Sequence, residues 1–257
     1  MDLGLANSRV LITGSSRGIG YGIASTFLEE GASVVLTGRD EDILGQAQAT
    51  LATKFGYDHV EVFAGDLGDA VVRMKLCNAL LPQGLDHLVC NIGSGKSVPI
   101  LEETAEEWQR MLDTNLLQAA GIVQALRSLL ARSGRGPSLT FVGSICGIEA
   151  IGCPLAYVAA KAALWGYAKN LARPLADQGI RVNMLSPGNI IFPGSTWEAK
   201  LSRDAAGVRQ MLDREVPMRR LGSLDEIAAV VAFLASRQAS FITGANLVVD
   251  GGQTRGL

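Results

Sequence analysis

Seven short runs rich in β-branched and aliphatic residues alternate along the chain with longer stretches that have amphipathic-helix spacing. Several runs are apolar with little alternation, as in strands of a parallel sheet that helices cover on both faces. This order favours an α/β fold with an open, doubly wound sheet between two layers of helices. The runs are Arg9–Thr13, Ser33–Thr37, His59–Phe63, His87–Cys90, Ser138–Val142, Ile180–Leu185 and Asn246–Val249.

Some of the helical stretches carry start or stop signals. Apolar residues recur every fourth position from Ile19 to Phe27, and Gly31 follows as a typical helix terminator. The sequence TAEE at residues 104–107 has the capping-box pattern, which predicts the start of another helix. A long helix is predicted from about Leu155 to Ala176.

The length of 257 residues, 48% of them hydrophobic, is enough for one domain with a sizeable core. No repeat, low-complexity tract or linker divides the sequence, so we expect a single domain over residues 1–257. The long irregular stretch from Pro187 to Pro217 follows a predicted strand, where substrate lids occur in such folds. We therefore expect a lid at about residues 188–217.

Charge and hydropathy narrow the classes of function. The formal net charge is −2 and no basic run stands out, which argues against nucleic-acid binding through phosphate contacts. The N-terminus does not resemble a secretory leader, and no apolar window is long enough to span a bilayer. We expect a soluble cytoplasmic protein with neither a nucleic-acid nor a membrane partner.

The cysteines and histidines do not indicate a metal site. The four cysteines form no CxxC pair, and the two histidines lie beside apolar runs, away from any cysteine cluster. We expect reduced, buried thiols and half-exposed histidines on strands. For the cysteines near residue 150, an inert pocket wall and a reactive thiol are both open. The residues concerned are Cys77, Cys90, Cys146, Cys153, His59 and His87.

A glycine-rich turn, TGSSRGIG at residues 13–20, follows the first predicted strand and opens the first predicted helix. Gly14, Gly18 and Gly20 suit a tight turn, a close approach of the backbone to a pyrophosphate and close packing of helix on strand. The spacing is GxxxGxG rather than GxGxxG, and a glycine-rich turn also arises for structural reasons alone. The turn nevertheless favours a dinucleotide site.

The end of the second predicted strand indicates which dinucleotide would bind. An NAD enzyme has an acidic residue there, which accepts hydrogen bonds from the ribose hydroxyls. Here Gly38 is followed by Arg39, and Arg17 lies within the glycine turn. Two guanidinium groups at this corner suit a 2′-phosphate, which arginine binds with paired hydrogen bonds. The sequence favours NADP(H) over NAD(H); the alternative is that both arginines are solvated loop charges.

A second set of residues carries the chemistry. Tyr157 and Lys161 form a YxxxK pattern, and Ser144 lies thirteen residues before the tyrosine. With the glycine turn and Asn115, this set resembles the short-chain dehydrogenase/reductase family. FITGANLVVDGG at residues 241–252 resembles the C-terminal signature of that family. RLGSLDEIA at residues 220–228 is similar to its 3-oxoacyl-carrier-protein-reductase-like members.

The resemblance covers nearly the whole chain. It implies a single-domain Rossmann-type fold, doubly wound, with a mostly parallel seven-stranded sheet and helices on both faces. It also implies a homotetramer or homodimer, built partly on the helices around Leu116–Leu130 and Leu155–Ala176.

The residue types support a proton-transfer role. Tyrosine titrates at about pH 10 in water, so it is a weak acid at pH 7. A lysine four residues later lies on the same helical face, and its ammonium is expected to lower the pKa of Tyr157. Tyr157 could then protonate a carbonyl oxygen while Ser144 hydrogen-bonds the developing oxyanion. The resemblance adds that Lys161 holds the nicotinamide ribose and that Asn115 holds a water linking Lys161 to solvent.

The remaining cofactor contacts follow from the resemblance, residue by residue. They lie after the third predicted strand, where the family contacts adenine, and in the turns after the fourth and sixth. The candidate catalytic residues are Asn115, Ser144, Tyr157 and Lys161. The candidate cofactor contacts are Gly14, Ser16, Arg17, Gly18, Ile19, Gly20, Arg39, Asp66, Leu67, Asn91, Gly93, Tyr157, Lys161, Pro187, Gly188 and Ile190.

The turn after the fourth predicted strand departs from the family pattern. The family usually has Asn-Asn-Ala-Gly there, whereas this chain has CNIG at residues 90–93, followed by SGKS. GSGKS looks like the end of a P-loop, but Cys90 stands where a P-loop needs its first glycine. Lys96 is either a solvated loop lysine or a contact for an anionic substrate. Phe192 also stands where the family often has a threonine that contacts the carboxamide.

We therefore expect an NADP(H)-dependent oxidoreductase that moves a hydride between nicotinamide and a carbonyl/alcohol pair. A 3-oxoacyl thioester is the first candidate substrate, from the similarity at residues 220–228. The alternatives are a keto-sugar or sugar phosphate in surface-glycan synthesis, and a non-catalytic dinucleotide-binding sensor. No metal is expected.

Overall fold

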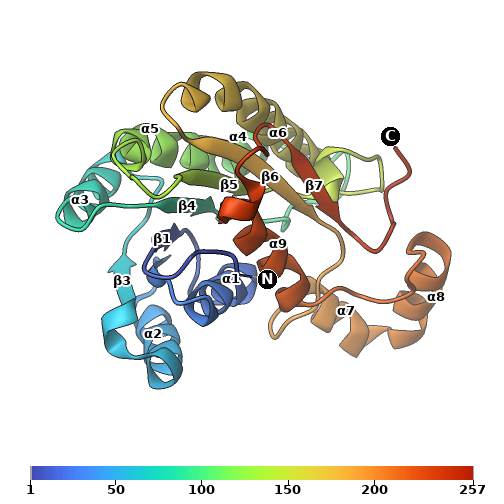
Figure 1. The fold of residues 1–257 in the computed structure, drawn as a ribbon. Coiled ribbons are helices and arrows are strands. Elements are labelled where there is room, and N and C mark those ends of the chain that lie inside the picture. Colours follow the sequence, from blue (N-terminus) through green and yellow to red (C-terminus); the bar gives the residue numbers. More distant parts are fainter. Residues whose placement is uncertain (1, 257) are drawn as a thin grey trace.

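A computed structural model, which describes residues 2–256, has one seven-stranded sheet between two layers of helices (Figure 1). All neighbouring strands are parallel, in the order β3-β2-β1-β4-β5-β6-β7. The doubly wound α/β fold expected from the sequence is confirmed. The strands are β1 (Arg9–Ile12), β2 (Ser33–Gly38), β3 (Val60–Ala64), β4 (His87–Cys90), β5 (Ser138–Val142), β6 (Arg181–Pro187) and β7 (Asn246–Val249).

The strand ends agree with the sequence prediction to within two residues. β4, β5 and β7 have the predicted bounds. β6 continues beyond Leu185, because its pairing with β7 extends to Pro187 opposite Val249.

Helices cover both faces of the sheet (Figure 1). α1, α2 and α9 pack on one face, in an apolar cluster that includes Phe27 and Leu36. α3, α5 and α6 cover the other face, where the cluster includes Phe141 and Leu164. This double cover explains why the strand sequences are apolar on both sides. The helices are α1 (Gly18–Glu29), α2 (Glu41–Phe55), α3 (Ala70–Leu80), α4 (Ala105–Leu112), α5 (Gln118–Leu130), α6 (Leu155–Ala176), α7 (Thr196–Arg203), α8 (Ala205–Glu215) and α9 (Leu224–Ala235).

The predicted helix signals are found, with one exception. α6 has the predicted bounds, and Gly31 follows α1 with a φ of 78°. Thr104 caps α4, since its hydroxyl accepts a hydrogen bond from the backbone N–H of Glu107. The predicted capping box is incomplete, because the Glu107 carboxylate does not accept from the backbone N–H of Thr104. It binds Ser97 and Arg110 instead.

The segment expected to form a lid contains two short helices. α7 and α8 lie together at one end of the sheet (Figure 1). They pack around Val208, Leu212 and Val216, a small apolar cluster distinct from the two that flank the sheet. Within residues 2–256, no helix is both long and apolar enough to cross a membrane.

The prediction of half-exposed strand histidines is wrong. His87 is 2% exposed, because β4 lies in the middle of a sheet covered on both faces. Its Nδ1 lies 2.9 Å from Ser138 Oγ, and burial lowers its pKa to about 4. His59 lies in a short 3₁₀ turn before β3 and is exposed.

Candidate active site

The strand order reverses between β1 and β4, and ligands of open α/β sheets bind in the crevice beyond the strand ends at such a point. The glycine turn follows β1 here, and Asn91 follows β4. The side-chain amide of Asn91 donates to the backbone oxygens of Thr13 and Gly14, both at 3.0 Å. The two turns that border the crevice are therefore fixed to one another.

The glycine turn has the backbone geometry that the sequence predicted. Gly14 and Gly18 have φ angles of 63° and 62°, in the left-handed region that favours glycine. A Cβ atom at Gly20 would lie 2.5 Å from the backbone oxygen of Gly14. Because α1 begins at Gly18, its free N–H groups and the positive end of its dipole lie at the turn, which fits a pyrophosphate.

A cleft runs along this edge of the sheet as two adjoining cavities, which share Gly14, Arg17, Asn91, Gly93 and Ser94. The predicted site residues that line it are Gly14, Ser16, Arg17, Gly18, Ile19, Arg39, Asp66, Leu67, Asn91, Gly93, Tyr157 and Lys161.

Four predicted cofactor contacts do not line the cleft as the structure describes it. Gly20 packs behind the turn. Pro187 ends β6, and Gly188 packs on Asp250. Ile190 lines a separate small cavity with Met218.

One end of the cleft is cationic. Arg17 and Arg39 both line it and are exposed. Within residues 2–256, neither has an acidic partner at ion-pair distance. Gly38 precedes Arg39, so no side chain projects into this corner from the end of β2, and a Cβ atom there would be in ordinary van der Waals contact with Ser16. The corner can therefore take a phosphate group.

The other end of the cleft holds the groups expected to carry the chemistry. α6 presents Tyr157 and Lys161 one turn apart, and Ser144 follows β5. Ser144 lies close enough to the hydroxyl of Tyr157 to affect its pKa. Ser144 Oγ also accepts from the backbone N–H of Cys146 at 3.1 Å, which orients the serine. The structure thus brings the predicted serine, tyrosine and lysine together.

Burial determines how the tyrosine and lysine titrate. It raises the pKa of Tyr157 and outweighs the effect of Ser144, which lowers it. The expectation that Lys161 lowers this pKa is therefore wrong here. The lysine ammonium donates to Val142 O at 3.0 Å and lies 6.0 Å from the centre of the Tyr157 ring. Burial lowers the pKa of Lys161 to about 8. Tyr157 is protonated at neutral pH and is thus suited to donate a proton.

Asn115 joins this group through a local distortion between α4 and α5. Residues Asp113–Leu117 form a π-helical turn, a feature often found at functional sites. The buried amide of Asn115 donates to Ser94 O at 3.1 Å, and its Oδ1 accepts from Ser94 N at 3.0 Å. A Cβ atom at Gly93 would lie 2.8 Å from Asn115 Oδ1 and 3.0 Å from Lys161 Nζ. Gly93 thus lies directly between Asn115 and Lys161.

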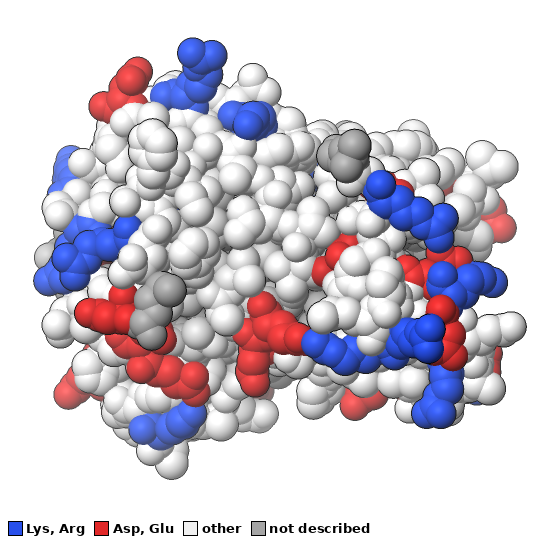
Figure 2. Space-filling model, turned by 45° about the vertical axis from the view of Figure 1, so that its right-hand side comes forward, with Lys and Arg blue, Asp and Glu red and all other residues white. Residues whose placement is uncertain are grey.

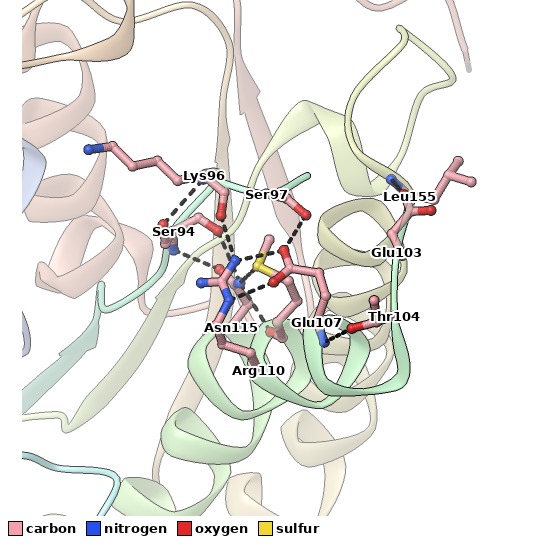
Figure 3. A network of polar contacts seen from close by, with 10 residues as sticks. Ser94, Lys96, Ser97, Glu103, Thr104, Glu107, Arg110, Asn115 and Leu155 are labelled. Atoms are coloured by element: carbon pink, nitrogen blue, oxygen red, sulfur yellow. Dashed lines mark hydrogen bonds and ion pairs between the residues drawn. The ribbon is translucent and has the colours of Figure 1, made fainter. Parts of the chain in front are cut away.

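The GSGKS segment does not form a P-loop. In a P-loop the lysine directly precedes a helix, whereas residues 91–99 have no regular structure and α4 begins only at Ala105. The sequence analysis missed Glu107 and Arg110, which hold this segment from α4 (Figure 3). Their spacing of three residues on a helix, with opposite charges, was the only available signal.

Two features beside the chemical groups, a disulfide and an aromatic side chain, differ from expectation or from the family pattern. Cys146 and Cys153, expected as reduced thiols, form a disulfide that closes the loop between Ser144 and Tyr157. A free reactive thiol in this loop is thereby excluded, while Cys77 and Cys90 are free. Phe192 lines the cleft, and a Cβ atom at Gly18 would lie 2.8 Å from its ring.

The chain is similar in sequence to proteins of known activity. A family model described as "Enoyl-(Acyl carrier protein) reductase" matches residues 14–254. The chain is 35% identical over 243 residues to the 3-oxoacyl-[acyl-carrier-protein] reductase FabG of Escherichia coli, which covers 94% of this chain and 95% of that protein. It is also 35% identical over 253 residues to mouse dehydrogenase/reductase SDR family member 4, covering 96% of this chain and 88% of that one.

Solved structures are similar over the full length. L-sorbose reductase from Gluconobacter frateurii, complexed with NADPH and L-sorbose, has a TM-score of 0.92 and 32% identity, with 100% of both chains covered. The RhlG/NADP active-site complex of Pseudomonas aeruginosa has a TM-score of 0.88 and 31% identity, with 98% of both chains covered.

Proposed function

Because the chain belongs to the short-chain dehydrogenase/reductase family of oxidoreductases, we propose that it is an NADP(H)-dependent reductase of a carbonyl substrate. One observation carries the proposal: Tyr157, with Ser144 beside its hydroxyl, and Lys161 line a cleft that continues into the glycine turn. A non-catalytic dinucleotide sensor would not need these groups together.

The cleft fits a dinucleotide, which when bound supplies the hydride. The N-terminus of α1 and the left-handed turn at Gly14 and Gly18 would hold its pyrophosphate. Ser144 orients the substrate carbonyl, and Tyr157 donates the proton to its oxygen. Lys161, whose ammonium lies 6.0 Å from the centre of the Tyr157 ring, would replenish the proton. Asn115 borders Lys161 across Gly93 and is the residue through which a water would reach the lysine.

The proposed preference for NADP(H) rests on the cationic corner. Arg17 and Arg39 line the same cavity and have no acidic partner at ion-pair distance within residues 2–256, so the 2′-phosphate would meet two guanidinium groups. Among the similar structures, the L-sorbose reductase is complexed with NADPH.

For the substrate we propose a 3-oxoacyl thioester, supported by the similarity to the 3-oxoacyl-[acyl-carrier-protein] reductases. A keto-sugar is the second candidate, favoured by the full-length similarity to an L-sorbose reductase. A panel of both carbonyl classes, followed at the nicotinamide absorbance with NADPH and NADH, tests the proposal. Binding of NADPH with no turnover of any carbonyl would favour the sensor.

We further propose that the protein is a homotetramer or homodimer in the cytoplasm and that residues 188–217 act as a substrate lid. Phe241 is fully exposed beside β7, and Leu117 and Leu155 are exposed on the helices expected to form an interface. The face in Figure 2 has a broad area free of charged side chains, as an interface would need. Light scattering and cell fractionation test the assembly and the location.

A further inference from the structure

The loop of residues 94–97 forms one wall of the cleft next to the tyrosine. A Cβ atom at Gly95 would lie 3.7 Å from the Tyr157 ring, so the backbone of the loop packs on that ring. Ser94 and Gly95 both line the cavity that contains Tyr157 and Lys161. The next residue, Lys96, is therefore placed at the edge of the space where a substrate carbonyl must lie.

Side chains hold this loop at three successive places (Figure 3). Asn115 makes two hydrogen bonds with the backbone of Ser94. Arg110 donates to the backbone oxygen of Lys96 at 2.8 Å. Glu107 accepts from the hydroxyl of Ser97 at 2.5 Å. A solvated lysine on a mobile loop would not need this support, so the backbone position of Lys96 is defined by the fold.

This network leaves one positive charge, that of Lys96, uncompensated within residues 2–256. Arg110 binds Glu107 through two nitrogens, at 2.7 Å each, so these two charges compensate one another. Hydrogen bonds from Arg110 and Ser97 lower the pKa of Glu107 to about 2, which keeps the pair ionised. Lys96 has no acidic partner at ion-pair distance within residues 2–256. Its side chain extends away from the network in Figure 3, so its ammonium is available for a ligand.

We propose that Lys96 binds an anionic group of the carbonyl substrate, a carboxylate or a phosphate, and that Glu107 and Arg110 are positioning residues for it. This inference rests on the proposed carbonyl reductase function and specifies its substrate class. The anion comes either from the carbonyl compound itself, as in a ketose phosphate, or from the phosphates of a thioester carrier. Both sources present the same chemistry to the lysine.

Matched substrate pairs test the proposal. One pair is a ketose and its phosphate ester; the other is a 3-oxoacyl N-acetylcysteamine thioester, which has no phosphate, and the same acyl group on coenzyme A. Lys96→Met should raise the KM of the anionic member about ten-fold more than that of the neutral member, because one charge-assisted hydrogen bond is lost. The pair that responds identifies the source of the anion. Lys96→Arg should restore most of the difference.

Controls separate this role from other effects. Lys75→Met on α3, an exposed lysine outside the cleft, should leave both members of each pair unchanged. Arg110→Ala should reproduce the selective rise in KM, although Lys96 itself is intact. The inference would be overturned if KM rose equally for the neutral and anionic members. It would also be overturned if a weaker affinity for NADPH accounted for the whole loss. Either result would leave the reductase function standing. If the wild-type protein reduces none of these carbonyls, the proposed function falls, and this inference with it.

Discussion

The two ends of the cleft hold their cations in opposite ways. At the chemical end, Lys161 is 4% exposed and its ammonium is hydrogen-bonded to a backbone oxygen. At the other end, Arg17 and Arg39 are exposed. A buried ammonium has a lowered pKa and can exchange a proton near neutral pH, whereas an exposed guanidinium remains charged and only attracts an anion. One end is thus suited to proton transfer and the other to phosphate recognition.

The largest expected effect lies at the chemical end. Tyr157→Phe removes the proposed proton donor and should lower kcat by about 10³-fold or more, while the dissociation constant for NADPH, measured by fluorescence titration, changes little. Stopped-flow and steady-state assays measure the loss. Retention of near wild-type kcat would refute the assignment of the proton donor.

A change at the cationic corner should alter cofactor preference and leave kcat nearly unchanged. Arg39→Asp places a carboxylate where the 2′-phosphate is expected and should shift the NADPH/NADH ratio of kcat/KM by about 100-fold toward NADH. The kcat with saturating cofactor should change little, because the chemical end is intact. An unchanged NADPH preference would show that this corner does not recognise the phosphate.

The buried lysine should give the reaction a pH dependence that the arginines cannot give. Since the pKa of Lys161 is lowered to about 8, kcat for carbonyl reduction should fall as the pH rises through about 8. In the unfolded chain lysine titrates at about 10.4, so between these values the unfolded state binds more protons. The free energy of unfolding should therefore rise across this window relative to Lys161→Met, measured by urea unfolding. A flat difference would contradict the burial of a titrating ammonium.

The smallest effect on turnover is expected from the disulfide, which closes the loop beside the chemical end only. Reduction, or the Cys146→Ser and Cys153→Ser double substitution, should lower the free energy of unfolding by about 2 kcal/mol through the entropy of the unfolded chain. Substrate KM should rise a few-fold while NADPH affinity is unchanged. A larger loss of NADPH affinity than of substrate affinity would argue that the loop supports both ends.

The parts predictable from sequence were those defined by local spacing. The glycine turn and the Tyr157–Lys161 pair each lie within one turn or one helix, so the residues that form them are close together in the sequence and can be recognised there. The disulfide, the burial of His87 and the support of Lys96 by Arg110 depend on how distant segments meet. The raised pKa of Tyr157 was also missed. Helical spacing predicts that a lysine is nearby, but it does not indicate how deeply the tyrosine is buried.

The position of Gly93 limits which residues the sequence can carry in this turn. Any side chain there would have to displace Asn115 or the ammonium of Lys161, since neither neighbour leaves space for a methyl group. Lys96, by contrast, is exposed, and its side chain extends away from the neighbouring hydrogen bonds in Figure 3. A substitution at Lys96 can therefore alter which substrate fits, whereas Gly93, only three positions before it, has no space for a side chain.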